Sequence, residues 1–339
     1  MSDLDIEIND GGAGARLRVA TAPLPAAAGA RLTWALEGAF GADEKPDIYV
    51  TPMAKGMDAA VSRDEFAWIE ADGRAVSASW LGRPADEPRI GTLGEVYTDP
   101  AWRRRGFAHR TCGALVERFD AGGGRWLFLA TDTADAARIY RSLGFEPFPE
   151  GLMRRVQPAG RSFEDEWFRP SAVTVRAIHR GDLVRLVALY AAPNPWLSIA
   201  WMDGIYSASH VTHNRCNSLI KHTWLATRAG AWLGLTNVEG AIVGAAPLEP
   251  TGNERDPVEA RLDLFVHPAF RSTADRLLQA ALAEARERGW RWLSVQVADG
   301  DDDKASVLAE AGFRDVATLP AAIRIGGRDR DVRLLRLAL

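Results

Sequence analysis

Cysteine is nearly absent from the sequence: Cys112 and Cys216 are the only two among 339 residues. Two cysteines exclude a disulfide-rich secreted framework, and reduced thiols in a cytosolic protein are the simpler interpretation. The sequence also lacks an apolar run near the ~18 residues that a membrane-spanning helix needs. The N-terminal stretch "MSDLDIEINDGGAGARL" is acidic and glycine-rich, without the pattern of a signal peptide, and predicts a flexible lead-in. We therefore expect a cytoplasmic protein.

The sequence also lacks a histidine–cysteine cluster of the kind that binds zinc, and it has no net positive charge. His210 and His213 have no C-x-x-C pair near them, so we expect no metal site. The net charge of -4 and the pI near 5.9 argue against nucleic acid as a partner, and the missing apolar run argues against a membrane. We expect a monomer or a homodimer that binds small molecules.

Two stretches of the sequence resemble each other at a constant spacing. "GTLGEVYTDPAWRRRGFAHR" and "EARLDLFVHPAFRSTADRLL" share an acidic residue, an apolar run and a Pro-Ala-aromatic-Arg sequence. Pro100 matches Pro268, and further on Gly144 matches Gly312 with the same separation along the chain. One spacing at two separate anchors indicates an internal duplication.

The duplication and the length predict two domains. We expect an N-terminal domain over residues 1–158 and a C-terminal domain over residues 172–339. The linker between them, residues 159–171, lies in a stretch with prolines, a glycine and mixed charges.

The order of elements can be followed through the first copy. "EFAWIEADGRAVSASWLGR" predicts two strands that turn at Asp72–Gly73, and "RIGTLGEVYTDP" predicts a third strand. A helix is expected from near Gly106 until the glycines 122–124, followed by the short strand "RWLFLAT" and a helix that Gly144 ends. The second copy repeats this order. The predicted fold class is α+β, with three layers: two domains, each a mixed, mostly antiparallel sheet flanked by helices.

The turn "DPAWRRRGFAHR", residues 99–110, joins the third strand to the following helix. The first N–H groups of a helix have no partner within it, and the helix dipole favours negative charge there. Gly106 and Ala108 lack the bulk that would hold a ligand off the backbone, and Arg103–Arg105 supply cationic donors. The turn is therefore either a seat for a pyrophosphate or a solvated basic turn.

The motif [QR]-x-x-G-x-[GA] between a strand and a helix, followed by "ARIYRSLGF", resembles the GNAT acyltransferase superfamily. The resemblance covers most of the first copy and, more weakly, most of the second. Two such domains in one chain are similar to the tandem GNAT proteins, among them mycothiol synthases and the tandem GNAT protein of the clavulanic acid gene cluster. The resemblance implies an acetyl-CoA-dependent N-acyltransferase that acts on a small-molecule amine in bacterial secondary metabolism, such as antibiotic biosynthesis.

The resemblance also implies a binding path for acetyl-CoA. The pantetheine arm would lie along the third strand like an added strand, and a backbone N–H near Tyr97 would support the oxyanion. Thr133 stands where many relatives have asparagine. The residues expected to bind the cofactor are Val96, Tyr97, Thr98, Arg103, Arg104, Arg105, Gly106, Phe107, Ala108, His109, Arg110, Thr133, Ala137 and Tyr140.

Acyl transfer to an amine asks for a base, because the amine arrives protonated with a pKa near ~10. Glu95 is the candidate base, or else a surface carboxylate on an alternating strand. Tyr140 falls on the tyrosine that protonates the leaving thiolate in many GNAT enzymes, or else it is a core aromatic residue.

The second copy departs from this pattern. In place of Arg104 to Ala108 it has Ser272 to Arg276, without the glycine and with Asp275 near the expected phosphates. Leu308 replaces Tyr140, whereas Asp263 keeps an acidic residue at the position of Glu95. Either the first copy catalyses, or it holds a structural acetyl-CoA while the second copy transfers the acyl group with Asp263 as base.

Three functions stay open for the chain. These are the N-acyltransferase for a small amine, non-catalytic binding of acyl-CoA, and an N-acetyltransferase for peptides or proteins. The acceptor loop is expected over residues 192–206, where Trp196, Trp201 and Tyr206 would line a pocket or else pack in a core.

Overall fold

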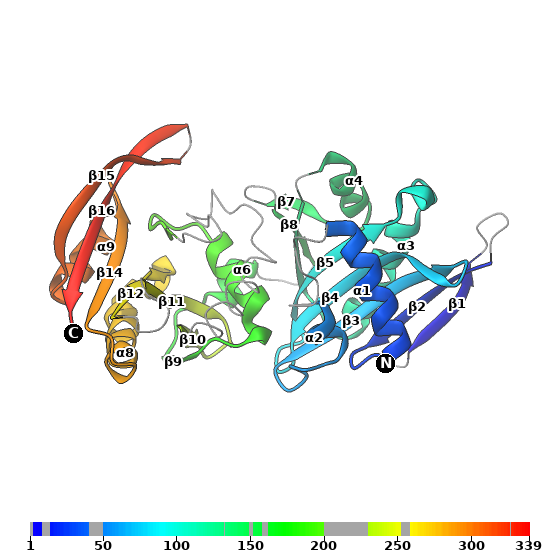
Figure 1. Ribbon diagram of the computed structural model, residues 1–339, viewed down its shortest axis with the longest axis horizontal. Helices are drawn as coiled ribbons and strands as arrows, with labels where there is room; N and C mark the ends of the chain where they lie inside the picture. The colour runs from blue at the N-terminus through cyan, green and yellow to red at the C-terminus, as the bar shows by residue number, and fades with distance from the viewer. Residues whose placement is uncertain are drawn as a thin grey trace. The chain divides into compact units, whose positions relative to one another are not determined.

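The computed structural model describes residues 3–8, 14–40, 50–131, 133–148, 152–157, 162–199, 230–251, 258–325 and 327–339. The chain divides into two compact units. The first consists of Met1–Pro158 with Arg180–Val184, and the second of Ala159–His179 with Arg185–Leu339. Each unit is built around its own sheet (Figure 1).

The sheet of the first unit has eight strands. Among the described strands, β5 and β6 form its only parallel pair. In spatial order the strands are β1 (Leu4–Ile8), β2 (Ala15–Thr21), β3 (Ser62–Ala71), β4 (Arg74–Pro84), β5 (Ile90–Thr98), β6 (Trp126–Ala130), β8 (Leu152–Val156) and β7 (Glu146–Phe148).

Helices cover both faces of this sheet. α1 (Ala26–Phe40) crosses in front of the strands in Figure 1, next to the short α2 (Val50–Ala54), and α3 (Phe107–Ala121) lies behind them. On the α3 side, Leu115 and Phe119 pack with Leu81, Leu93 and Leu127 of the strands, and α4 (Ala134–Ser142) adds Tyr140 to the same core. A short 3-10 turn, η3 (Pro100–Trp102), joins β5 to α3.

Local sequence signals explain most of these boundaries. The β3–β4 hairpin turns at Asp72 and Gly73, whose φ angles of 49° and 75° are those of a tight hairpin turn with both residues left-handed. α3 ends at Gly122 and Gly123, and Gly144, with φ 85°, follows the end of α4. These three predictions are confirmed.

The predicted flexible lead-in is wrong. Leu4–Ile8 forms β1 and pairs with β2 from Leu4 opposite Val19 to Ile8 opposite Ala15. The segment alternates apolar and acidic residues, but Leu4 and Ile6 are exposed, so pairing with β2 rather than burial of one face makes it a strand. Ile8 is buried, and Asp5 accepts a hydrogen bond from Arg16 Nε at 3.0 Å on the other face.

The second unit has a sheet with the same strand order as β2 to β7 of the first. The strands are β9 (Val173–Ala177), β10 (Ala231–Asn237), β11 (Ile242–Thr251), β12 (Glu259–Leu262), β14 (Trp292–Ala298), β16 (Arg328–Ala338) and β15 (Arg314–Ile325), with β13 (Phe265–Val266) paired to β11. The helices are α5 (Phe163–Trp167), α6 (Leu183–Ala191), α8 (Ala274–Glu287) and α9 (Asp302–Glu310), with the 3-10 segment η5 (Pro268–Thr273). The 3-10 segment η4 (Arg180–Asp182) and the first two residues of α6 belong to the first unit.

The same contacts recur in the two units at the spacing that separates Pro100 from Pro268. Arg103 Nε donates to Thr98 O at 3.1 Å, and Arg271 Nε donates to Val266 O at 3.1 Å. In each sheet the parallel pair occupies the same position, β5–β6 in one and β12–β14 in the other. Two mixed, mostly antiparallel sheets flanked by helices confirm the predicted fold class.

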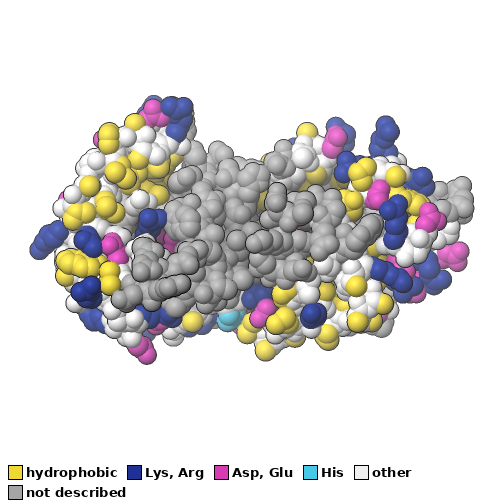
Figure 2. Space-filling view, in the orientation of Figure 1, with side chains coloured by type: hydrophobic (Ala, Val, Ile, Leu, Met, Phe, Trp, Pro, Cys, Tyr) yellow, Lys and Arg dark blue, Asp and Glu magenta, His cyan; other side chains and the backbone are white. Residues whose placement is uncertain are grey.

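Charged side chains of both signs are interspersed on the face drawn in Figure 2. The field near any bound anion therefore depends on the residues that surround it. Within the described ranges, no helix is both long enough and apolar enough to cross a membrane.

Candidate acyl-CoA site

The turn between β5 and α3 exposes backbone to solvent. Arg104 and Gly106 adopt left-handed φ angles of 63° and 75°, and α3 begins at Phe107 with Gly106 as its N-cap and no side chain capping it. A Cβ atom added to Gly106 would meet no atom within 4 Å, so the space above this residue is open. Because the first N–H groups of a helix lack partners within it, this end of α3 can bind an anion.

Basic side chains surround this end of α3. Those of Arg103, Arg104, Arg105, His109 and Arg110 are all exposed. Besides the bond of Arg103 to the end of β5, the Arg105 guanidinium lies 4.6 Å from the Trp102 ring centroid. Trp102 in turn stacks on Phe107 at 5.9 Å. Contacts of their guanidinium groups thus hold two arginines beside the exposed amides.

β5 separates from its parallel neighbour just before this turn. The β5–β6 pairing covers only Ile90–Thr92 opposite Trp126–Phe128, whereas β5 continues to Thr98. The structure also has a β-bulge here, because Ala78 pairs with Tyr97 but Trp80 pairs with Gly94. Val96, Tyr97 and Thr98 therefore lie where the two strands diverge, next to the basic turn.

Glu95 is the residue at the centre of the bulge. Its φ angle is 50°, and only 2% of its surface is exposed. The alternative of a solvated surface carboxylate is therefore excluded. Sequence patterns gave no sign of the bulge, because the residue with the unusual backbone is a glutamate and not the adjacent Gly94.

The structure brings Tyr140, Ala137 and Val96 into one hydrophobic cluster. Tyr140 is 5% exposed, and its ring meets the Phe145 ring edge-on at 6.1 Å. The ring therefore packs in the core, and whether its hydroxyl also donates a proton stays a prediction. Thr133 is the N-cap of α4, where its Oγ1 accepts from the Ala136 N–H at 3.3 Å.

Two arginines and a glutamate hold α3 against the sheet. Arg118 Nε donates to Glu65 Oε1 at 2.5 Å, and Arg83 Nη2 donates to Glu65 Oε2 at 2.8 Å, with all three side chains buried. Burial alone would raise the pKa of Glu65, but the Arg83 charge and the Arg118 hydrogen bond outweigh it and lower that pKa. The sequence patterns did not lead to this cluster, although the acidic residue in the apolar stretch "DEFAWI" is a signal for it.

Residues 62–147 match the family model of the acetyltransferase (GNAT) domain. The match runs from β3 into β7, so it contains the bulge, the basic turn, α3 and α4. The first unit thus contains the motif region of the acetyltransferase (GNAT) domain. Below, "GNAT domain" means this matched region.

Other proteins resemble parts of the chain. An uncharacterized protein of Mycobacterium leprae (strain TN) is 43% identical over 68 residues, which is 19% of this chain and 18% of that protein. The ribosomal-protein-alanine N-acetyltransferase of Brucella melitensis is 23% identical, with a TM-score of 0.40 over 49% of this chain and 99% of its own. A phosphinothricin acetyltransferase of Sinorhizobium meliloti, solved in complex with AcCoA, is 14% identical, with a TM-score of 0.41 over 49% of this chain and 88% of its own.

The corresponding turn of the second unit is built differently from that of the GNAT domain. η5 runs to Thr273 and α8 starts at Ala274, with no intervening left-handed residue. Arg276 Nη1 donates to Val173 O at 2.6 Å, and Asp275 lies in the first turn of α8. This turn therefore lacks the exposed glycine, has Ser272 and Thr273 at the positions of Arg104 and Arg105, and presents the exposed Asp275 at the position of Phe107.

Asp263 is buried in an ion pair. Lys304 Nζ donates to Asp263 Oδ1 at 2.7 Å, and the Leu264 N–H donates to the same oxygen at 2.8 Å. The lysine side chain is fully buried. Since a paired carboxylate is a weaker proton acceptor, this arrangement favours a structural role for Asp263 over that of a base.

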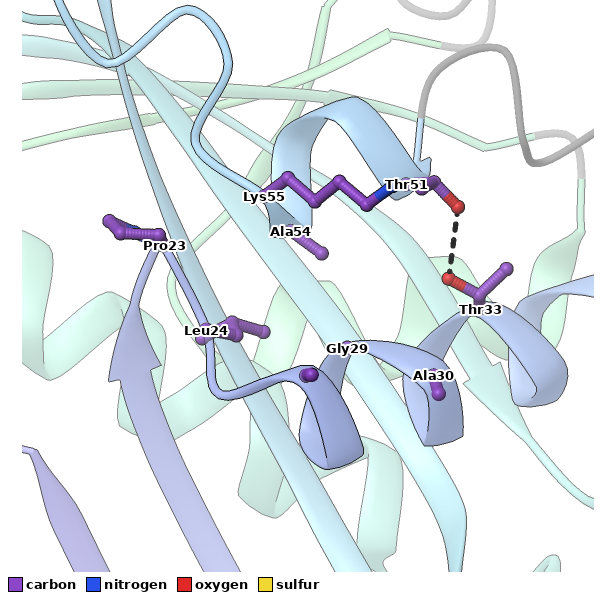
Figure 3. A pocket seen from close by; sticks show the side chains of 9 residues that line it. Pro23, Leu24, Gly29, Ala30, Thr33, Thr51, Ala54 and Lys55 are labelled. Atoms are coloured by element: carbon purple, nitrogen blue, oxygen red, sulfur yellow. Dashed lines mark hydrogen bonds between the residues drawn. The ribbon is translucent and has the colours of Figure 1, made fainter.

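A cavity of about 510 Å³ opens between the start of α1 and α2 (Figure 3). Thr33 Oγ1 and Thr51 Oγ1 bridge the two helices at 3.3 Å, and the Lys55 side chain extends along α2 toward Thr51. Most of the other residues that line the cavity have small side chains, and they form no motif by which the sequence could have predicted the cavity. The lining residues are Pro23, Leu24, Ala26, Gly29, Ala30, Thr33, Thr51, Ala54 and Lys55.

The structure describes the predicted acceptor loop, residues 192–206, only up to residue 199. Trp196 is buried in the second unit, with the Arg271 guanidinium 3.6 Å from its ring centroid. Trp201 and Tyr206 lie outside the described residues, as do His210, His213 and Cys216. Cys112 is buried in the core, and burial raises the pKa of its thiol to about 11, so we expect it to be unreactive.

Proposed function

We propose that the protein is an acetyl-CoA-dependent N-acyltransferase for a small-molecule amine and that the first unit carries both binding and catalysis. The observation that carries the proposal is the start of α3. α3 begins there without a side-chain cap, at the open, left-handed Gly106 and among exposed arginines. The adjacent end of β5 no longer pairs with β6, and the whole region lies within the match to the GNAT model.

Acetyl-CoA fits these residues by its charge and shape. The N–H groups of Gly106 to His109 and the guanidinium groups of Arg103–Arg105 would hold the pyrophosphate, whereas the Arg110 N–H donates to Gly106 O at 3.0 Å within α3. Val96–Thr98, Ala137 and Thr133 would border the pantetheine arm. When bound, acetyl-CoA supplies an acyl group activated as a thioester.

Side chains of the first unit would accept and donate the protons of the reaction. Glu95 would accept the proton that a protonated amine has to lose before it attacks. A backbone N–H near Tyr97 would donate to the developing oxyanion, and the Tyr140 hydroxyl would donate a proton to the departing sulfur. Because a thiol with a pKa near ~8.5 leaves readily, the tyrosine is helpful but not essential.

Two features of the second unit support acyl transfer in the first unit. Asp263 is held by Lys304, and the η5–α8 turn has no open glycine. The alternative, in which the first unit keeps a structural acyl-CoA and Asp263 acts as base, requires that ion pair to open first. A setting in bacterial secondary metabolism, a cytoplasmic location and a monomeric or dimeric state rest on the tandem resemblance and the composition.

Release of free thiol from acetyl-CoA tests this proposal. The purified chain is incubated with acetyl-CoA and with a panel of small primary amines, amino acids and short peptides. We expect release that depends on a small amine and an acetylated amine in the mass spectrum. Binding of acetyl-CoA without amine-dependent release would establish the non-catalytic alternative, and transfer to peptides alone would establish the peptide transferase.

We propose the cavity between α1 and α2 as the acceptor site, because α1, which lines it, packs on β4 and on β5, the strand that carries Glu95. Replacing Ala30, which lines it, by tryptophan would fill it with an indole. We expect the KM for the amine to rise about tenfold or more, because lost contacts worth ~1.4 kcal/mol weaken binding tenfold. The affinity for acetyl-CoA should stay unchanged.

Ala27→Trp is the matched control for this variant. Ala27 is exposed on the same helix and does not line the cavity. Equal KM values for the two tryptophan variants would show that the acceptor binds elsewhere.

A further inference from the structure

A short stretch of the second unit, Asn194–Ile199, is held by polar contacts along its length. We call it the inserted segment. Its residues from Trp196 to Ile199 are buried. Leu197 and Ile199 pack with Ala298 and Val332 of the sheet.

The contacts follow one direction along the segment. At its start, Asn194 Nδ2 donates to Val266 O at 2.9 Å, and Asn194 Oδ1 accepts from Arg271. In its middle, the Leu197 N–H donates to Asp301 Oδ2 at 2.7 Å, and Leu197 O accepts from Lys304 Nζ at 2.8 Å. Near its end, Ser198 Oγ donates to Asp263 Oδ2.

The partners of the inserted segment correspond to the acyl-CoA path of the first unit. At the spacing of Pro268 from Pro100, Val266 corresponds to Thr98, Arg271 to Arg103 and Asp301 to Thr133. Asp263 corresponds in the same way to Glu95. The segment thus runs from the counterpart of the pyrophosphate turn to the counterpart of the proposed base.

The sheet of the second unit opens at the matching place. The parallel β12–β14 pairing ends at Arg261 opposite Ser294, and β13 pairs only with β11 among the described strands. Asp263 precedes β13, while Asp301 and Lys304 follow β14. Since Leu197 and Ser198 bond to both sides, the segment lies between the two diverging strands.

We propose that the inserted segment is the resident ligand of this second cleft, where it takes the place that the pantetheine arm of acyl-CoA would take. The inference relies on the proposed function only for what the first cleft binds. The backbone N–H and C=O groups of Leu197 supply a donor and an acceptor, as the amides of pantetheine would, and the ion-paired Lys304 and Asp263 hold the segment through Leu197 O and Ser198 Oγ. The second cleft is therefore closed to acyl-CoA, and Asp263 positions the segment.

Peptide-level hydrogen exchange on the full chain, with and without saturating CoA, tests this inference. We expect peptides that cover residues 194–199 and 261–266 to exchange slowly in the ligand-free protein and to change less than about twofold with CoA. Lys304→Ala should speed exchange of the inserted segment by about tenfold or more, because it removes the bond to Leu197 O.

Ser198→Ala is a milder second variant, in case Lys304→Ala does not fold, and should speed the same peptides less. Arg324→Ala, which breaks an exposed pair with Asp329 on the β15–β16 hairpin, is the control and should leave them unchanged. Fast exchange of the segment in ligand-free wild type, or any marked response to CoA, would overturn the inference. If CoA protects no part of the first unit, the proposed function fails. The exchange rates of wild type and the variants without CoA still decide whether the inserted segment occupies the second cleft.

Discussion

Replacing Glu65 by alanine should destabilise the first unit by about 3–5 kcal/mol, because it leaves two buried guanidinium groups without their carboxylate. Arg83 and Arg118 both bond to Glu65, and their side chains are 6% and 4% exposed. Urea unfolding at pH 7, followed by hydrogen exchange in α3 peptides, measures the loss in this unit. Asp135→Ala breaks the exposed pair with Arg138 and is the control, with an expected loss below ~1 kcal/mol.

The same carboxylate makes stability depend on pH in a defined direction. The pKa of Glu65 is lower in the folded chain than its ordinary value of 4.5. Its contribution is therefore fully present above pH 4.5 and is lost as pH falls through the folded pKa. The advantage of wild type over Glu65→Gln should shrink below that pH. An advantage that stays constant down to pH 3 would contradict an ionised Glu65.

Glu95→Gln should lower kcat for amine acetylation by about 100- to 10,000-fold, the usual contribution of a general base. Glutamine keeps the size of the side chain in this buried bulge but cannot accept the proton. The affinity for acetyl-CoA should stay close to that of wild type. The remaining rate should rise with pH toward the acceptor's own pKa of ~10, because only the neutral amine can then react.

Asp263→Asn is the reciprocal variant for this prediction. If Asp263 only positions the inserted segment, kcat should stay near that of wild type while exchange in the second unit increases. Loss of turnover in Asp263→Asn, with Glu95→Gln still active, would move catalysis to the second unit.

Local signals in the sequence predicted the elements that depend on neighbouring residues. The hairpin at Asp72–Gly73, the start of α3 after Gly106 and the end of α4 before Gly144 each follow from one glycine that permits a positive φ angle. Residue types could not tell strand from lead-in at β1, because its partner β2 supplies the reason that it forms.

Contacts between residues that are far apart along the chain could not be predicted from the sequence. Glu65 and Arg118 are 53 positions apart, and Asp263 and Lys304 are 41 apart, so a local pattern can mark one member of such a pair but not its partner. The burial of Tyr140 and the bulge at Glu95 likewise depend on how β5, β6 and α4 pack. Such packing decides which candidate side chains can meet a ligand.

Hydrogen exchange of the wild-type chain with and without CoA tests most directly whether the start of α3 holds a diphosphate. We predict that saturating CoA slows the amides of residues 106–110, together with those of residues 96–98 on β5. No CoA-dependent protection at all, or protection confined to peptides remote from Gly106, would contradict the account.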